Sequence, residues 1–506
     1  MLKAIRSYFY RQPNRKCEYA TPEEEKRARM AAAQEQFKLW MAILPDILEK
    51  FSRIPDPRRP RNKRHKHTVL LFYGLLLFLF RYVSRREANR ELTGPTVFSI
   101  VHSLFPEIDS IPHMDTLARF LEKVSVEEIE RIIGETVKKL IHNKHLDRLV
   151  ADGSYVIAVD GTQKWIIDWE FSPEALRKTY GNVTKYQVYV LEAGLVGPKG
   201  VIIPLMSEFC ANPVDADEQT KQDCETNAFY RLAARLKSLF SKTPLMIVAD
   251  GLYPTGPVMG LCRANHWDFM IVLPSEVRLS DVQEEAKAIC DMERDQRLTY
   301  IWGDRIQEYS WANGILYTWR DSNGHYHHIK LNVVYCQETV EDGDEISQHI
   351  LAMKVPLERI EKKTRRLRRR RSKRSRTQTT HKVTKWVWIS SKTINSNNVV
   401  ERCNGGARLR WNIEEGILTE KDKIRGYAYE HMFSYNWHGM KAWHALMHLG
   451  HLLNILTYFS TGIWKIAQQR GINGLLRWLR QSITGNWTET SMLSKLPEKP
   501  QLRLVI

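Results

Sequence analysis

Several features of secreted proteins are missing from this sequence. Its seven cysteines are scattered along 506 residues, and none belongs to a Cys-x-x-Cys pair. Neither a zinc knuckle nor a disulfide framework is therefore indicated. The N-terminus also lacks the apolar stretch of a secretory signal peptide. From these absences we expect a protein of the reducing cytoplasm.

Long hydrophobic runs are scarce as well. The most apolar run covers residues 68–80 and is flanked by Lys66 and Arg81. A helix needs roughly 20 apolar residues to cross a bilayer, so this run is too short. It predicts a buried helix and no stable membrane association. The alternative is a membrane-associated helix, which stable solubility without detergent would exclude.

Acidic residues are too few to balance the basic ones. The chain has 76 lysines and arginines against 58 acids, which gives a net charge of +18. Such an excess indicates a polyanionic partner, and double-stranded DNA is the simplest one. The densest basic block is residues 362–376, in which Arg366, Arg369 and Arg370 are expected to contact DNA phosphates. A solvated surface loop is the alternative for this block.

Two short apolar runs each end in an acid and a glycine. Residues 156–159 are followed by Asp160, and residues 245–249 are followed by Asp250. Apolar runs bounded by turn signals are typical of buried strands, whose carboxyl ends are where ligands bind in an α/β sheet. Two such strands can place two carboxylates side by side. Oxygen ligands of this kind suit Mg²⁺ or Mn²⁺.

A third acid lies in a segment with helical spacing. Arg410, Glu414 and Lys421 are separated by four and seven residues, so one helical face would carry all three. An acid between two cations on one face suits an acid that binds metal and cations that meet phosphate.

These residues resemble the signature of DDE transposases from prokaryotic insertion sequences. In that family a Tyr-Arg-Glu-Lys signature accompanies two aspartates on a ribonuclease H-like core. The matching residues are Asp160, Asp250 and Glu414, with Arg410 and Lys421 for the signature's cations. The signature's tyrosine should fall at position 407, where this chain has Ala407.

The resemblance implies a fold, a reaction and partners. The fold is α/β, a ribonuclease H-like mixed sheet core with an N-terminal helical domain and a β-rich insertion before the last catalytic helix. The reaction is cutting of transposon-end DNA, through a hairpin, and joining to target DNA. Two Mg²⁺ or Mn²⁺ ions per site are implied, held by Asp160, Asp250 and Glu414, while Arg410 and Lys421 hold phosphates. A homodimer holding two DNA ends, near the nucleoid, is implied as well.

The chain divides into six predicted parts. They are a basic helical arm (1–67), a helical end-binding domain (68–148), the first part of the core (149–275), the insertion (276–400), core helices with Glu414 (401–459) and a basic tail (460–506). The expected core strands are 155–160, 185–196, 200–209, 245–249 and 269–273, and the expected core helices are 217–240 and 257–265. In the insertion, turn signals at 312–314 and 321–324 predict two hairpins.

Some assignments stay open at this point. Glu415 and Glu430 compete with Glu414, and Asp152 and Asp168 flank the first strand. Three tryptophans of the insertion could stack on a flipped DNA base, and Trp311 is selected from Trp302, Trp311 and Trp319. A relative with the fold but no catalysis, and a two-metal nuclease that cuts without joining, are the alternative functions.

Overall fold

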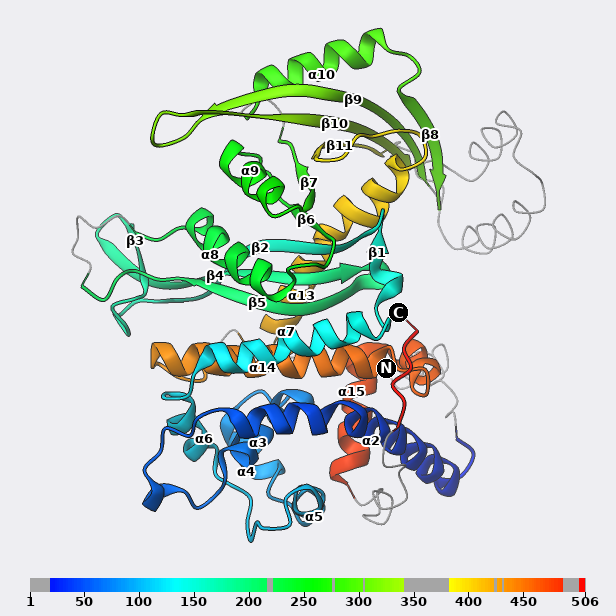
Figure 1. Cartoon of the computed structure of the whole chain (residues 1–506). Coiled ribbons are helices and arrows are strands. Elements are labelled where there is room, and N and C mark those ends of the chain that lie inside the picture. The colour runs from blue at the N-terminus through cyan, green and yellow to red at the C-terminus, as the bar shows by residue number, and fades with distance from the viewer. Residues whose placement is uncertain are drawn as a thin grey trace, which may run out of the picture. The chain divides into compact units, whose positions relative to one another are not determined.

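The computed structural model describes most of the chain. The described residues are 19–215, 222–274, 278–303, 305–340, 382–422, 426–429, 432–485 and 500–505. The chain divides into two compact units (Figure 1). The helical unit contains Met1–Ile132 with Asp422–Val505, and the sheet unit contains Ile133–Lys421. The C-terminal helices therefore belong with the N-terminal ones, which the six-part division did not anticipate.

The helical unit consists of helices and short connections. They are α2 (Pro22–Arg53), η1 (Pro60–Asn62), α3 (His67–Leu79), α4 (Arg85–Glu91), α5 (Pro95–Leu104), α6 (Met114–Leu121), the start of α7 (Val126–His142), α14 (Trp437–Tyr458) and α15 (Trp464–Thr484). Thr21 caps α2 by accepting from the Glu24 amide, and proline occupies the first turn. Both are ordinary helix-start signals.

The apolar run forms α3, as predicted, and the helix is buried on all sides from Thr68 onward. It packs against α2, α6 and α14 within the same unit. Glycine permits the close crossing with α14, because a Cβ at Gly450 would lie 2.6 Å from the Phe78 side chain. No helix among the described residues has both the length and the apolar character needed to cross a bilayer.

The sheet unit is built on a mixed sheet. Its core strands are β1 (Val150–Ala151), β2 (Ser154–Ile167), β3 (Leu176–Tyr180), β4 (Val183–Gly197), β5 (Val201–Cys210), β6 (Leu245–Ala249) and β7 (Asp268–Val272). Strands β5, β4 and β2 are antiparallel neighbours, and β6 and β7 continue parallel to β2. The order β5-β4-β2-β6-β7 with these directions is the ribonuclease H-like arrangement, as expected.

Two core helices follow β5 and β6. They are α8 (Glu225–Leu239) and α9 (Gly256–Ala264). Short turns η2 (Asp147–Leu149) and η3 (Pro198–Gly200) connect elements of the same unit. Helix α8 is shorter than the predicted 217–240, and residues 216–221 lie outside the described part.

The insertion is β-rich and extends the same sheet. It contains α10 (Ser280–Met292), which was not predicted, and β8 (Arg297–Trp302), β9 (Arg305–Arg320), β10 (Tyr326–Val340) and β11 (Lys382–Ser390). Strand β11 pairs with β7, so the sheet continues as β11-β10-β9-β8, with α10 packed along β9 (Figure 1). The predicted turn at Asp321–Gly324 is confirmed between β9 and β10.

The predicted turn at 312–314 is wrong. Strand β9 runs straight through Asn313 and Gly314, because β10 pairs with it on both sides of that point. The register shifts between Leu331 and Val333, and Gly314 has a φ of +77°. The Asn-Gly pair, which commonly forms a hairpin turn, therefore lies at a β-bulge here.

The predicted catalytic segment, residues 401–421, begins after β11. A π-helix, η5 (Glu401–Gly406), leads into a 3₁₀ turn, η6 (Ala407–Arg410), and then into α13 (Trp411–Lys421). Glu414 and Lys421 lie on α13, whereas Arg410 is the last residue of the turn before it. The observed helix thus starts at Trp411, one residue after the Arg410 of the sequence signature.

Candidate active site

Asp160 and Asp250 occupy equivalent places on neighbouring parallel strands. The pairing of β2 with β6 ends at Ala158 and Val248, and each aspartate lies two residues further on. Asp250 directly follows β6, as predicted, and its Oδ1 accepts from the Leu252 amide at 2.8 Å. Asp160 is not at a strand end, because β2 continues to Ile167 by pairing with β4. The two acids flank the point where β2 and β6 part.

Both aspartates point to the sheet face that α13 covers. Side chains alternate along a strand. Ala158 and Val248, two residues before each acid, lie in one buried cluster with Ile413 and Ile417 of α13. Asp160 and Asp250 therefore face the helix that carries Glu414.

The electrostatics of Asp160 show that the three predicted acids act on one another. Burial raises the pKa of Asp160 to about 7, and the carboxylates of Glu414 and Asp250 add to this rise. Arg410 opposes it, since its guanidinium favours the ionised carboxylate. Residues from three distant parts of the chain thus share one electrostatic environment.

The two signature cations differ in their surroundings. Arg410 is buried, its Nη1 lies 2.7 Å from Glu414 Oε1, and its guanidinium lies over the Trp411 ring. Lys421 Nζ donates to Thr162 Oγ1 at 2.7 Å, two residues beyond Asp160 on β2. Both cations therefore belong to the neighbourhood of the acids. The signature's tyrosine position, Ala407, is buried in the core and offers no polar group.

A buried ion-pair triad holds α13 to the sheet. Lys164 Nζ lies 2.5 Å from Glu192 Oε1 and 2.8 Å from Glu420 Oε2, and all three side chains are almost fully buried. Burial alone would lower the lysine's pKa, but the two carboxylates raise it above its ordinary value. The triad joins β2, β4 and α13 near the catalytic residues.

Two of the competing acids form ion pairs. Asp152 pairs with buried Arg402 and with Lys392, and Asp168 pairs with Lys185 and is 77% exposed. Glu415 is exposed and lies near Gly200, at the turn between β4 and β5. Glu430 lies outside the described residues.

The selected tryptophan is not available to DNA. Trp311 is 4% exposed and belongs to the buried cluster under β9, which contradicts the prediction that it stacks on a flipped base. Trp319 stacks between Tyr317 and His327 and lies close to Gly256 of α9. Trp302 is 40% exposed at the end of β8. Of the three candidates, Trp302 presents the most accessible ring.

Trp302 belongs to a group of aromatic rings next to the catalytic segment. The guanidinium of Arg408 lies 5.0 Å from the centre of the Trp302 ring and 5.3 Å from that of Trp386. Trp386 in turn meets the edge of Trp411, which is 46% exposed. Arg366, Arg369 and Arg370, the predicted phosphate contacts of the basic block, lie outside the described residues.

Sequence reasoning missed one acid of this site. Glu225, at the start of α8, also raises the pKa of Asp160 through its charge. Its carboxylate accepts hydrogen bonds from Tyr189 Oη at 2.5 Å and Tyr253 Oη at 2.6 Å. An acid in the first turn of a helix reads as an ordinary dipole partner, and no local pattern marks it further.

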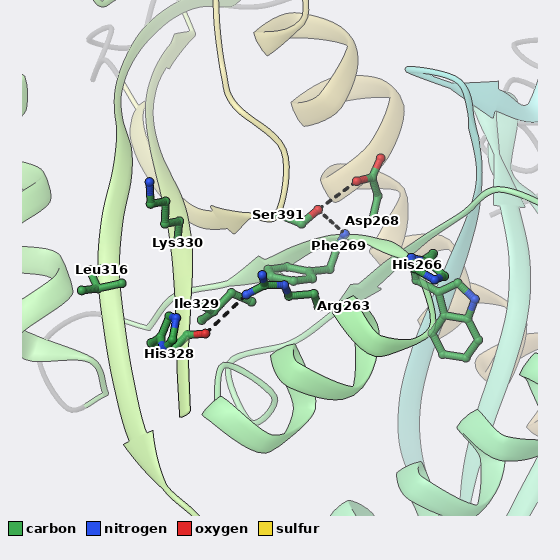
Figure 2. A pocket seen from close by; sticks show the side chains of 10 residues that line it. Arg263, His266, Asp268, Phe269, Leu316, His328, Ile329, Lys330 and Ser391 are labelled. Atoms are coloured by element: carbon green, nitrogen blue, oxygen red, sulfur yellow. Dashed lines mark hydrogen bonds between the residues drawn. The ribbon is translucent and has the colours of Figure 1, made fainter. Parts of the chain in front are cut away.

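A cavity of about 480 Å³ lies elsewhere in the sheet unit, between α9, β7 and the hairpin of β9 and β10 (Figure 2). Ser391 Oγ donates to Asp268 and accepts from the Phe269 amide, and Arg263 donates to the His328 carbonyl. Asp268 begins β7, whereas Asp250 follows the end of parallel β6. The cavity is therefore at the opposite edge of the sheet from the acids.

Comparisons with known proteins give two findings. Residues 48–136 match the family model described as DDE_Tnp_1-associated, a segment that runs from the end of α2 into α7. A solved structure, the cryo-EM structure of the piggyBac transposase synaptic complex with hairpin DNA, aligns with 92% of this chain and 82% of that chain. Its identity is 10% and its TM-score 0.35, so the fold assignment rests on strand order instead. No curated protein matches the chain significantly.

Proposed function

We propose that this protein is a DDE transposase that cuts transposon-end DNA and joins it to target DNA. The observation that carries the proposal is the shared electrostatic environment of Asp160, Asp250 and Glu414, where β2 and β6 part. The DDE_Tnp_1-associated match supports it from a separate part of the chain. The net charge of +18 suits a DNA substrate.

The residues of the site fit divalent metal ions. All the donors are carboxylate oxygens, which Mg²⁺ and Mn²⁺ prefer. Burial and, to a smaller extent, the neighbouring carboxylates raise the pKa of Asp160, and a bound cation would stabilise its ionised form. Two such ions would supply activation of a water or 3′-hydroxyl and stabilisation of the leaving oxygen.

The chain's own residues have separate roles in this proposal. Asp160, Asp250 and Glu414 would hold the metal ions. Arg410 pairs with the Glu414 carboxylate in the free protein. Lys421 donates a hydrogen bond to Thr162, which lies two residues beyond Asp160 on β2. Arg410 and Lys421 would bind the phosphates beside the scissile bond. Cutting through a DNA hairpin, and a dimer that holds two ends, belong to the same proposal.

The test uses the DNA that flanks the coding region. The purified protein is incubated with a duplex carrying the flanking inverted repeats and Mg²⁺, and nicked, hairpin and joined products are separated on denaturing gels. Asp160→Asn, Asp250→Asn and Glu414→Gln should each abolish cutting and joining. Glu415→Gln is the matched control, because this exposed neighbour on α13 should leave both activities intact.

The alternatives give different results in the same assay. A two-metal nuclease would cut without joining the 3′-hydroxyl to a second duplex. A relative without catalysis would bind the repeats and leave them whole. Full cleavage by Asp160→Asn would contradict the assigned residues.

A further inference from the structure

Glu225 approaches the site from the other face of the sheet. Asp160 points toward α13, so its neighbour Gly161 points toward α8, which begins with Glu225. A Cβ at Gly161 would lie 2.3 Å from Glu225 Oε2 and 2.4 Å from Tyr189 Oη. The carboxylate therefore lies directly over the backbone beside Asp160, in space that any other side chain at position 161 would fill.

Two tyrosines hold this carboxylate, one on each side of the gap between β2 and β6. Tyr189 belongs to β4, the partner of β2, and donates to Oε2. Tyr253 follows Asp250 by three residues and donates to Oε1. Burial raises the pKa of both tyrosines above the ordinary value, so they remain donors. Glu225 thereby links the Asp160 strand to the Asp250 loop.

The contacts leave the carboxylate able to bind a cation. Each oxygen accepts one hydrogen bond, and an ionised carboxylate has about four acceptor positions. None of the described ion pairs supplies a lysine or arginine to Glu225, whereas Asp152, Asp223 and Glu338 all have one. Its charge also acts on Asp160, as the charges of Asp250 and Glu414 do.

We propose that Glu225 is a fourth carboxylate of the divalent-ion site, held in place by Tyr189 and Tyr253, an assignment that rests on the proposed function. Glu225 would add a donor beside Asp160 and Asp250, since its two tyrosines belong to elements that flank these aspartates. The site would then receive donors from both faces of the sheet.

The test measures Mn²⁺ binding to the full-length protein by electron paramagnetic resonance of the free ion, without DNA. Glu225→Gln keeps the size and an acceptor oxygen but removes the charge. We expect it to lower Mn²⁺ affinity by about tenfold or more, as loss of a metal's ligands or their supports commonly does. Glu415→Gln, which removes the same charge from exposed α13, should change affinity less than twofold, roughly within error.

The outcomes separate this inference from the proposed function. If wild-type protein shows no Mn²⁺ site that Asp160→Asn removes, the proposed function fails and the inference with it. If that site exists and Glu225→Gln binds Mn²⁺ as wild type does, the inference alone is overturned. Should thermal melting show that Glu225→Gln does not fold, the double variant Tyr189→Phe, Tyr253→Phe replaces it, and unchanged affinity there overturns the inference equally.

Discussion

The ionised form of Asp160 is disfavoured in the folded protein by burial and by neighbouring carboxylates. The folded state raises the pKa of Asp160 from 3.8 to about 7, so it binds this proton more tightly than the unfolded chain does. The stability that the proton confers is complete below about pH 4 and is lost as pH rises toward 7. Functional carboxylate sites commonly carry such a penalty.

The first prediction follows from that sign. In the presence of a chelator, raising the pH from about 5 to 8 should destabilise wild-type protein more than Asp160→Asn, by at most about 3 kcal/mol. Denaturant unfolding at each pH measures the difference. Asp168→Asn, at an exposed acid, should follow wild type. Parallel curves for wild type and Asp160→Asn would show that folding does not raise the pKa of Asp160.

The second prediction at this scale concerns Trp302. Because its ring is accessible and lies beside the predicted catalytic segment, we propose it as the residue that stacks on a flipped base. Stacking contributes roughly 1 to 3 kcal/mol per base. Trp302→Ala should therefore reduce hairpin formation by about tenfold or more and leave the melting temperature nearly unchanged. Trp169→Ala, at a similarly exposed ring after β2, is the control, and an equal loss in both variants would refute the assignment.

The local patterns around single residues explain which acids of the candidate site could be predicted. Asp160 and Asp250 end apolar runs, and Glu414 shares a helical spacing with two cations, so each has a signal within a few positions. Glu225 has none, because its tyrosine partners are 36 and 28 residues away. Trp311 was selected wrongly, since a tryptophan in a strand carries no sequence sign of which face is buried.

Elements of the sheet unit are joined at the start of the catalytic segment by buried Arg402. This residue of η5 is fully buried, and its Nη1 lies 2.7 Å from Asp152 Oδ2, in the turn between β1 and β2. Its Nη2 donates to Ser390 Oγ at the end of β11. One guanidinium thus ties the turn before the Asp160 strand to the insertion's last strand and to the segment that leads to Glu414.

Removing this cation is the third prediction. Arg402→Met would leave Asp152 without its buried partner, and breaking a buried ion pair costs about 3 to 5 kcal/mol. Lys392→Met is the matched control, because Lys392 contacts the same Asp152 carboxylate but is 46% exposed. Exposed pairs contribute about 1 kcal/mol or less. Chemical denaturation of both variants should separate them clearly, and equal effects would contradict the role given to burial.

Strand boundaries show what local sequence could specify. Strand β6 was predicted at Leu245–Ala249, where a short apolar run lies between turn signals. Strand β9 was divided at Asn313–Gly314, because an Asn-Gly pair usually forms a two-residue hairpin. Pairing with β10 on both sides of that point favoured a bulge instead. Long-range pairing thus decided the element, and no local pattern reveals it.

The fold of the protein does not explain the net positive charge of the chain. The sheet topology of a ribonuclease H-like core follows from buried strands and helices, and the insertion extends it by pairing β11 with β7. Neither needs a net charge of +18. Sequence alone could predict the β-rich insertion but not its junction with the core sheet, because only three residue pairs join β7 to β11.

The last prediction concerns that charge. DNA binding should weaken steeply with salt, since each phosphate contact changes the logarithmic slope by about 0.9 through counterion release. Replacing residues 362–376 with serine and glycine should make the slope of log K against log salt shallower. The change should correspond to the loss of several phosphate contacts, roughly 3 or more. Phosphate contacts carry no sequence information, so affinity should fall equally for the inverted repeats and a random duplex. Titrations at a series of salt concentrations measure both slopes. A loss confined to the repeats would mean that the block reads sequence, and an unchanged slope would mean that it does not touch DNA.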